Sequence, residues 1–230
     1  MSGNRWALSA VVLAAIGCAS SGLQGQGDGH TFATPRQNVS STPAGPTAAA
    51  PETSAQPAAA GAALPEPTGR DPLSESVPIG DDLVRGRGTV RCAVPLARVR
   101  EMVLKYDDYA QFMPFYKSSH VLDRDAESTK VYMQVAALNG LVKMGAQLKM
   151  PNAPKKENGW DVYESQFESG NVQDFKAIWR MKAIDDQGSF LSLEVALLPK
   201  LPLPTSTLNN ENVKGAVNGV TAMRARAEQK

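Results

Sequence analysis

Few side chains in this 230-residue chain have the chemistry of a catalytic group, and they are scattered. His120 is the single histidine after residue 79. It could act as a general base, for example in an aldol-type cyclisation. A lone histidine on a short strand is more often structural or exposed, so this reading stays open. No second histidine or cysteine cluster completes a metal site, and we expect none.

Three glutamates on neighbouring expected strands are the candidate carboxylate pairs: Glu164, Glu168 and Glu194. Paired carboxylates could share acid and base roles. Solvated positions beside basic residues of the same sheet explain them equally well, namely Lys176, Arg180 and Lys182. The sequence contains no Gly-rich phosphate loop, nucleophile elbow or Ser/His/Asp arrangement, and we expect no cofactor.

Arginines gather where the expected fold begins. Arg85, Arg87 and Arg91 share one face of a strand, and Arg98 and Arg100 follow shortly after. They could contact anionic lipid head groups, or they could form an ordinary solvated strand face. The formal net charge is only +1, which predicts no electrostatic attraction to nucleic acid.

The elements that must position these residues follow from alternating apolar residues between turn-forming breakers. An expected first strand, Leu83–Val94, carries Gly86 and Gly88 on its inward parity, which predicts a bend or a close backbone approach. The further expected strands are Ser118–Leu122, Lys130–Ala136, Leu141–Met150, Trp160–Glu168, Val172–Ala183 and Ser189–Leu198.

Helical spacing marks three segments. Pro95 opens the first helix, which ends near Asp107, and a second short turn is stopped by Pro114. The long final helix is expected over Thr207–Lys230, with Ser206 and Thr207 as N-cap candidates. Its apolar stripe comprises Val213, Ala216, Val217, Val220, Met223 and Ala227. The order of elements predicts an α+β fold with helices on one face of a curved antiparallel sheet of about seven strands.

The first 17 residues are typical of a secretory signal, with Arg5 before an apolar run from Trp6 to Ile16. That run is shorter than a membrane-spanning helix requires. Ala15-Ile16-Gly17-Cys18 resembles the lipobox of bacterial lipoproteins, with Ala15 where Leu is usual. An ordinary signal peptide with a chance cysteine is the alternative. On the lipoprotein reading Cys18 carries lipid, and Cys92 is a lone buried thiol.

Residues 18–79 are rich in Pro, Ala, Ser, Thr and Gly and lack helical or strand periodicity. Such a composition cannot bury enough apolar surface to fold, so we expect a disordered tether. The folded domain is then expected over residues 80–230.

The order of elements resembles the START-like helix-grip superfamily, especially its polyketide cyclase or coenzyme Q-binding branch. The resemblance rests on Val94-Pro95, on the segment from Tyr106 to Pro114, and on the following strand, and it covers residues 80–230. It implies a hydrophobic tunnel between the sheet and the final helix. The implied lining is Met102, Tyr109, Phe112, Met113, Met133, Met144, Phe175, Trp179, Leu193, Val217, Val220 and Met223. The same residues could instead simply fill a core.

Three functions stay open at this point. The first is a lipid-anchored, periplasm-facing monomer that holds a lipid, quinone or polyketide-like molecule. The second is a cyclase or dehydratase of the same fold that uses His120 or a strand carboxylate as base. The third is a structural envelope lipoprotein with a filled core. Ala19 after the lipidated cysteine favours the outer membrane over the inner under enteric-type sorting.

Overall fold

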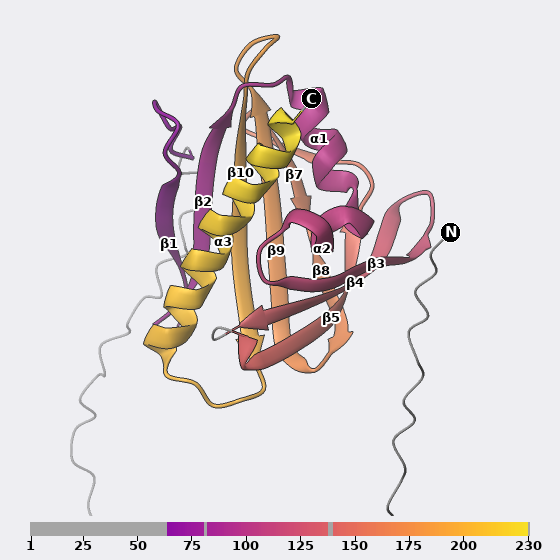
Figure 1. Cartoon of the computed structure of the whole chain (residues 1–230), viewed down its shortest axis with the longest axis vertical. Helices are drawn as coiled ribbons and strands as arrows, with labels where there is room; N and C mark the ends of the chain where they lie inside the picture. The colour runs from indigo at the N-terminus through magenta and orange to yellow at the C-terminus, as the bar shows by residue number, and fades with distance from the viewer. Residues whose placement is uncertain (1–63, 81, 138–139, 230) are drawn as a thin grey trace, which may run out of the picture. The chain divides into compact units, whose positions relative to one another are not determined.

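A computed structural model describes residues 64–80, 82–137 and 140–229. The predicted signal peptide, Cys18 and the greater part of the predicted tether lie outside the described residues. The described part is an α+β domain in which two antiparallel sheets curve around one long C-terminal helix, α3 (Figure 1). The predicted fold class and the predicted order of elements are confirmed.

The larger sheet has six strands in the order β1-β2-β10-β9-β7-β6. In that order they are Leu73–Gly80, Leu83–Cys92, Ser189–Pro199, Val172–Ala183, Trp160–Glu164 and Lys155–Glu157. The smaller sheet has the order β3-β4-β5-β8. Its strands are Tyr116–Arg124, Ser128–Ala137, Val142–Pro151 and Gln166–Gly170. The described strands therefore number ten, which exceeds the predicted seven.

The helices are α1 (Leu96–Leu104), the 3-10 turn η1 (Tyr106–Asp108), α2 (Tyr109–Phe112) and α3 (Thr205–Glu228). The long helix begins two residues before the predicted start. Pro204 occupies its N-cap and no side chain caps it, so the predicted caps at Ser206 and Thr207 are wrong. Proline is compatible with the start of a helix, because its φ angle is fixed close to the helical value and because it has no backbone N–H that would need a hydrogen-bond acceptor.

The predicted strand Trp160–Glu168 is two strands that belong to different sheets. β7 pairs with β9, whereas β8 pairs with β5, and the chain changes sheet at Ser165. Ser165 keeps its hydrogen bonds at the break: its N–H donates to Ala177 O (2.9 Å), and its Oγ accepts from Ala177 N (2.8 Å). This crossing links the two sheets into one curved surface.

The folded part also begins earlier than predicted. β1 is an edge strand antiparallel to β2, with Leu73 opposite Thr89. The prediction of a tether reaching residue 79 is therefore wrong at its C-terminal end. The preceding residues are held as well, because Glu66 pairs with Lys182 at 2.7 Å and Arg70 pairs with Glu228 at 2.7 Å.

The core lies between the sheets and the helices. All seven methionines of the described residues are buried in it, namely Met102, Met113, Met133, Met144, Met150, Met181 and Met223. The predicted close approach at Gly86 and Gly88 is confirmed. A Cβ at Gly86 would meet Asn212 O at 2.2 Å, and one at Gly88 would meet Ala216 O at 2.9 Å. The two glycines thus let α3 lie directly on the backbone of β2.

Candidate ligand-binding site

An apolar cavity of about 100 Å³ opens between the N-terminal half of α3 and the curved sheets. Leu193, Val195 and Leu197 of β10 form one wall, and Phe175 of β9 lies beside them. The ends of β4 and β5 and the loop after α2 form the opposite wall. Four of the lining residues carry a polar group: Tyr116, Thr207, Glu211 and Asn212. The cavity therefore suits an apolar ligand or an apolar part of one.

The partly exposed lining residues Phe115, Leu203 and Glu211 border the open end of this cavity, which we call the mouth. Phe115 adopts a φ angle of 71°, in the left-handed region that bulky residues rarely enter. Its carbonyl oxygen accepts a hydrogen bond from Ala136 N at 2.8 Å, which fixes the loop to the end of β4. Lys214 Nζ of α3 lies 5.4 Å from the centre of the Phe115 ring. This cation–π contact closes one side of the mouth.

Asn212 bridges β2 and β10 in the cavity wall, beyond the point where these two strands stop pairing. The β2–β10 ladder ends at Gly86 and Val195, so the backbone groups beyond it have no strand partner there. Asn212 Oδ1 accepts from Leu197 N (3.0 Å), and its Nδ2 donates to Val84 O (3.1 Å). The buried amide thus replaces a missing peptide between the strands, and its own polar groups are satisfied.

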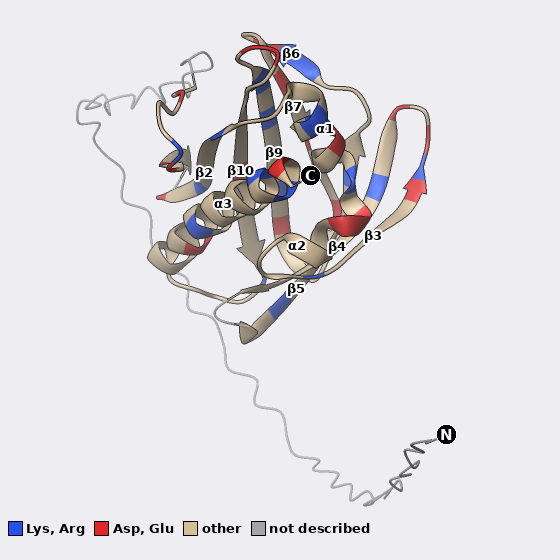
Figure 2. Cartoon of the chain, turned by 45° about the horizontal axis from the view of Figure 1, so that its top comes forward, with Lys and Arg blue, Asp and Glu red and all other residues tan. Residues whose placement is uncertain are grey.

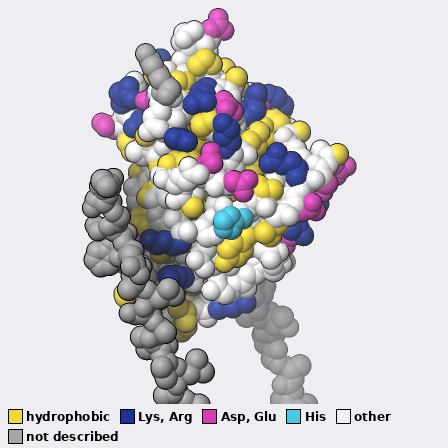
Figure 3. Space-filling view, turned by 45° about the vertical axis from the view of Figure 1, so that its right-hand side comes forward, with side chains coloured by type: hydrophobic (Ala, Val, Ile, Leu, Met, Phe, Trp, Pro, Cys, Tyr) yellow, Lys and Arg dark blue, Asp and Glu magenta, His cyan; other side chains and the backbone are white. Residues whose placement is uncertain are grey.

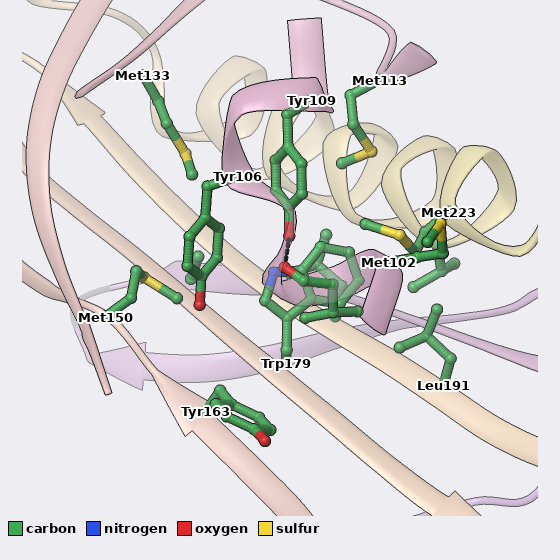
Figure 4. Close-up of a cluster of buried hydrophobic side chains, with 14 of the residues drawn as sticks. Met102, Tyr106, Tyr109, Met113, Met133, Met150, Tyr163, Trp179, Leu191 and Met223 are labelled. Carbon is green, nitrogen blue, oxygen red and sulfur yellow. Dashed lines mark hydrogen bonds between the residues drawn. The ribbon is translucent and has the colours of Figure 1, made fainter. Parts of the chain in front are cut away.

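A closed aromatic cluster fills the core beyond the inner end of the cavity (Figure 4). Tyr109 lies at its centre, with edge-on ring contacts to Tyr106, Phe112, Tyr116 and Trp179. Its hydroxyl donates to Val103 O at 2.6 Å. Burial raises the pKa of Tyr109 well above its usual value and that of Tyr116 to about 12. Both phenols are therefore protonated at neutral pH.

The structure separates the twelve predicted lining residues into two groups. Met113, Met144, Phe175 and Leu193 border the cavity. The others lie elsewhere: Met102, Tyr109, Met133, Trp179, Val220 and Met223 are buried in the closed core, Phe112 packs against it, and Val217 lies over Gly88 of β2. Figure 4 shows Met102, Tyr109, Met133, Trp179 and Met223 among the buried side chains.

The structure places the candidate catalytic groups away from the cavity. His120 is exposed on β3, where Figure 3 shows it on the molecular surface. Glu164 pairs with Lys176 at 2.5 Å and Glu168 with Lys130 at 2.9 Å. The hydrogen bond from Lys176 lowers the pKa of Glu164. None of these groups contributes to the cavity lining.

Of the two readings left open for Glu194, a carboxylate pair or a solvated position, the structure supports neither. Its side chain is fully buried on the sheet face opposite α3. Three arginines surround it, with Arg85 at 3.0 Å, Arg87 at 2.8 Å and Arg180 at 2.5 Å. Arg85 and Arg87 were predicted as a free basic face, whereas here they compensate a buried charge. Arg91 remains exposed.

The two arginines of α1 also have acidic partners. Arg98 pairs with Glu101 at 3.0 Å, and Arg100 pairs with the buried Asp161 at 2.5 Å. Lys156 contacts the same carboxylate. Burial alone would raise the pKa of Asp161, but the hydrogen bonds from Lys156 and Arg100 outweigh it and lower the pKa. Figure 2 shows Lys and Arg interspersed with Asp and Glu over the domain.

Sequence reasoning missed the polar residues of the site, Thr207, Tyr116, Glu211 and Asn212. Asn212 carried a usable signal. It lies four residues before Ala216, so a polar amide stands on the apolar stripe of the helix. No three His, Cys, Asp or Glu residues of the described part gather so that they could hold a metal ion. Within residues 64–229, apart from the gaps given above, no helix is long and apolar enough to cross a membrane.

Comparison with known protein families agrees with this architecture. The model of a family described as polyketide cyclase / dehydrase and lipid transport matches residues 92–210, just over half of the chain. The chain belongs to this polyketide cyclase / lipid transport family. No curated protein matches the chain in sequence. The predicted START-like resemblance is confirmed at the level of family and fold.

Solved structures of START-like proteins share the fold at low sequence identity. A STAR-related lipid transfer protein fragment from Xanthomonas axonopodis is 15% identical, with a TM-score of 0.60 over 71% of this chain and 97% of that chain. Human STARD10 is 10% identical, with a TM-score of 0.54 over 63% of each chain. A START superfamily protein from Mycobacterium smegmatis is 16% identical, with a TM-score of 0.51 over 62% of this chain and 96% of that chain.

Proposed function

We propose that this family member is a binding protein that holds an apolar small molecule in the cavity between α3 and the sheets. The observation that carries the proposal is the apolar cavity itself, which opens at the mouth and has few polar groups in its wall. Release of water from the ligand and from these walls would drive binding. A lipid, a quinone or a polyketide-like molecule has the required character.

The cavity volume limits what enters it without a change of shape. Its volume of about 100 Å³ is small beside the roughly 300–1,000 Å³ of typical small-molecule pockets. A long acyl or isoprenoid chain would therefore extend through the mouth or displace neighbouring side chains. Met113 and Met144 in the wall suit such displacement, because methionine is flexible and adapts to different shapes.

The proposal includes an attachment to the bacterial cell envelope. Cys18 would carry lipid after removal of residues 1–17, and the Pro- and Ala-rich segment before residue 64 would connect that anchor to the domain. The domain would face the periplasm at the outer membrane. The support for this part is the sequence pattern around Cys18 alone.

Binding is favoured over catalysis by the chemistry of the cavity wall. A cyclase or dehydratase needs a group that takes up or releases a proton near the substrate. Of the described lining residues, Glu211 stands at the mouth in a weak ion pair with Lys214 at 3.7 Å. Burial raises the pKa of Tyr116 to about 12, so its phenol releases a proton less readily than an ordinary tyrosine does. His120, a candidate base for the alternative enzymatic function, is outside the cavity.

Native mass spectrometry of the Cys18→Ala chain without residues 1–17, purified without detergent, tests the proposal. We expect a reproducible small-molecule adduct that denaturation releases. The matched variant is Gly215→Leu. Gly215 lines the cavity, and a Cβ there meets no atom within 4 Å, so the leucine side chain should fill the cavity without disturbing α3. We expect this variant to fold and to lose the adduct.

Two results would contradict the binding function. One is bare protein that also fails to take up added phospholipids and quinones. The other is an adduct that Gly215→Leu retains at the wild-type level, which would place the ligand elsewhere. The intact mass of denatured wild-type protein from membranes tests the anchor separately, because lipidation of Cys18 adds the mass of its acyl and glyceryl groups.

A further inference from the structure

Large apolar side chains are exposed around the mouth of the cavity. Five such residues are exposed in the described part of the chain, and three belong to loops at the mouth: Phe115 is 37% exposed, Leu141 86% and Leu201 52%. Phe115 itself lines the cavity. Leu201 lies between two lining residues, Pro199 at the end of β10 and Leu203 in the β10–α3 loop. Leu141 directly precedes β5, in the connection that follows the lining end of β4. The exposed apolar groups are therefore concentrated at the mouth rather than scattered.

Each of these apolar residues has an exposed lysine close by. Lys117 follows Phe115 by two residues, Lys143 follows Leu141 by two, and Lys200 directly precedes Leu201. A fourth exposed lysine, Lys214, reaches the Phe115 ring from α3. Exposed apolar side chains flanked by lysines are typical of surfaces that bind an anionic bilayer. The apolar side chains enter the acyl boundary, and the ammonium groups contact the lipid phosphates.

The loop that carries Phe115 is held in a conformation that exposes the ring. Its φ angle of 71° is unfavourable for a bulky residue, and the hydrogen bond from Ala136 N maintains it. Strained backbone of this kind concentrates at functional positions. The strain therefore supports a functional role for the exposed apolar group.

We propose that the rim formed by Phe115, Leu141, Leu201 and the four neighbouring lysines docks into an anionic lipid bilayer, with the mouth facing the acyl region. This inference rests on the proposed binding function and adds the surface through which its apolar ligand enters. Docking in this orientation lets the ligand pass from lipid to cavity without crossing water.

The test places a fluorescent probe at the rim. In the Cys18→Ala chain without residues 1–17, Leu141→Cys is labelled with an environment-sensitive nitrobenzoxadiazole group. The remaining thiol, Cys92, is buried, and burial raises its pKa to about 12, so it should not react. The control chain carries Asp186→Cys instead, an exposed position in the β9–β10 turn at the opposite end of the strands.

Vesicles of phosphatidylcholine with phosphatidylglycerol should shift the emission of the probe at position 141 to shorter wavelength and raise its intensity several-fold. The probe at position 186 should respond little. Because both chains lack residues 1–17, attachment through the N-terminal apolar run contributes to neither response. The double substitution Lys117→Glu and Lys143→Glu, with an unchanged circular dichroism spectrum, should remove most of the response at position 141.

Three outcomes would overturn the docking proposal. They are no response at position 141, an equal response at both positions, and an equal response with pure phosphatidylcholine vesicles. The first is also the result expected if a soluble protein covers this face. Ligand retention in the native mass spectra is independent of these outcomes, so failure of docking is distinguishable from failure of binding.

Discussion

At the scale of single residues, Gly86 marks the closest approach of α3 to the sheet. A Cβ at this position would lie 2.2 Å from Asn212 O and 2.3 Å from Val213 Cα. These are backbone atoms of a long helix, so no side-chain rotation can relieve the overlap. We expect Gly86→Ala to lower the free energy of unfolding by about 2–3 kcal/mol, as other overpacking substitutions do. Urea unfolding followed by circular dichroism measures this change.

Gly215→Ala is the matched control for that prediction. A Cβ at Gly215 meets no atom within 4 Å, and the residue lies in the interior of α3. Alanine should raise the free energy of unfolding there by about 0.5–1 kcal/mol, because glycine loses more backbone entropy in a helix. Equal losses from both substitutions would show that glycine flexibility, not the space under α3, decides the outcome.

The sequence predicts the glycine contact but not which of the twelve expected lining residues border the cavity, and the reason is geometric. Alternation along a strand tells which face a residue is on, and Gly86 is on the inward face. It does not tell how far along the strand the core is filled. Trp179 and Leu193 have the same parity, yet Trp179 closes the core while Leu193 borders the cavity. That difference depends on what lies opposite each residue, which local spacing does not contain.

At the scale of elements, the strands with strong alternation between clear breakers were predicted within a few residues. Three features were missed. One is the short strand β6 (Lys155–Glu157), in a segment whose composition is typical of a loop. β1 carries Pro78 and buries its side chains only partly, so its composition is typical of a linker. The change of sheet at Ser165 interrupts a continuous apolar alternation, and only the pairing of β7 with β9 and of β8 with β5 determines it. Pairing between distant strands is a tertiary property.

Asn212 joins α3 to the sheet and provides a test at this scale. Its amide bridges Leu197 N and Val84 O, which have no strand partner where β2 and β10 diverge. We expect Asn212→Ala to lower the free energy of unfolding by about 2–4 kcal/mol, since it removes a buried side chain and leaves two part-buried backbone groups without a partner. Thermal and urea unfolding measure the loss.

Asn209, one turn earlier, is the comparison for this prediction. It makes similar bonds, accepting from Val84 N at 3.0 Å and donating to Asp82 O at 2.8 Å, but near the end of the strand. The bond to Asp82 O is exposed, so water can replace it, and Asn209→Ala should cost about 1 kcal/mol or less. If Asn212→Ala cost no more than Asn209→Ala, the bridging role of Asn212 would be contradicted.

At the scale of the whole domain, the chain enters at the end opposite the mouth. Glu66 pairs with Lys182 at the end of β9, and Arg70 pairs with Glu228 in the last turn of α3. The mouth lies along the first half of that helix, whose 24 residues extend over about 36 Å at 1.5 Å per residue. An anchor at Cys18 would thus hold the domain from one end and leave the rim at the other end free to reach a lipid surface.

Cleavage by trypsin after Arg70 tests whether the ion pair between Arg70 and Glu228 holds the chain against the domain at this point. The protease must take the Arg70 side chain into its own specificity pocket, which requires the ion pair with Glu228 to open. Exposed ion pairs contribute up to about 1 kcal/mol, so Glu228→Ala should speed cleavage at this bond by about two- to fivefold. Mass spectrometry identifies the product that begins at Asp71.

Glu211→Ala, which removes an α3 carboxylate at the mouth, should leave the rate unchanged. Equal rates in all three proteins would mean that the chain is held only from β1 onward, and that the connection to any membrane anchor is longer by several residues.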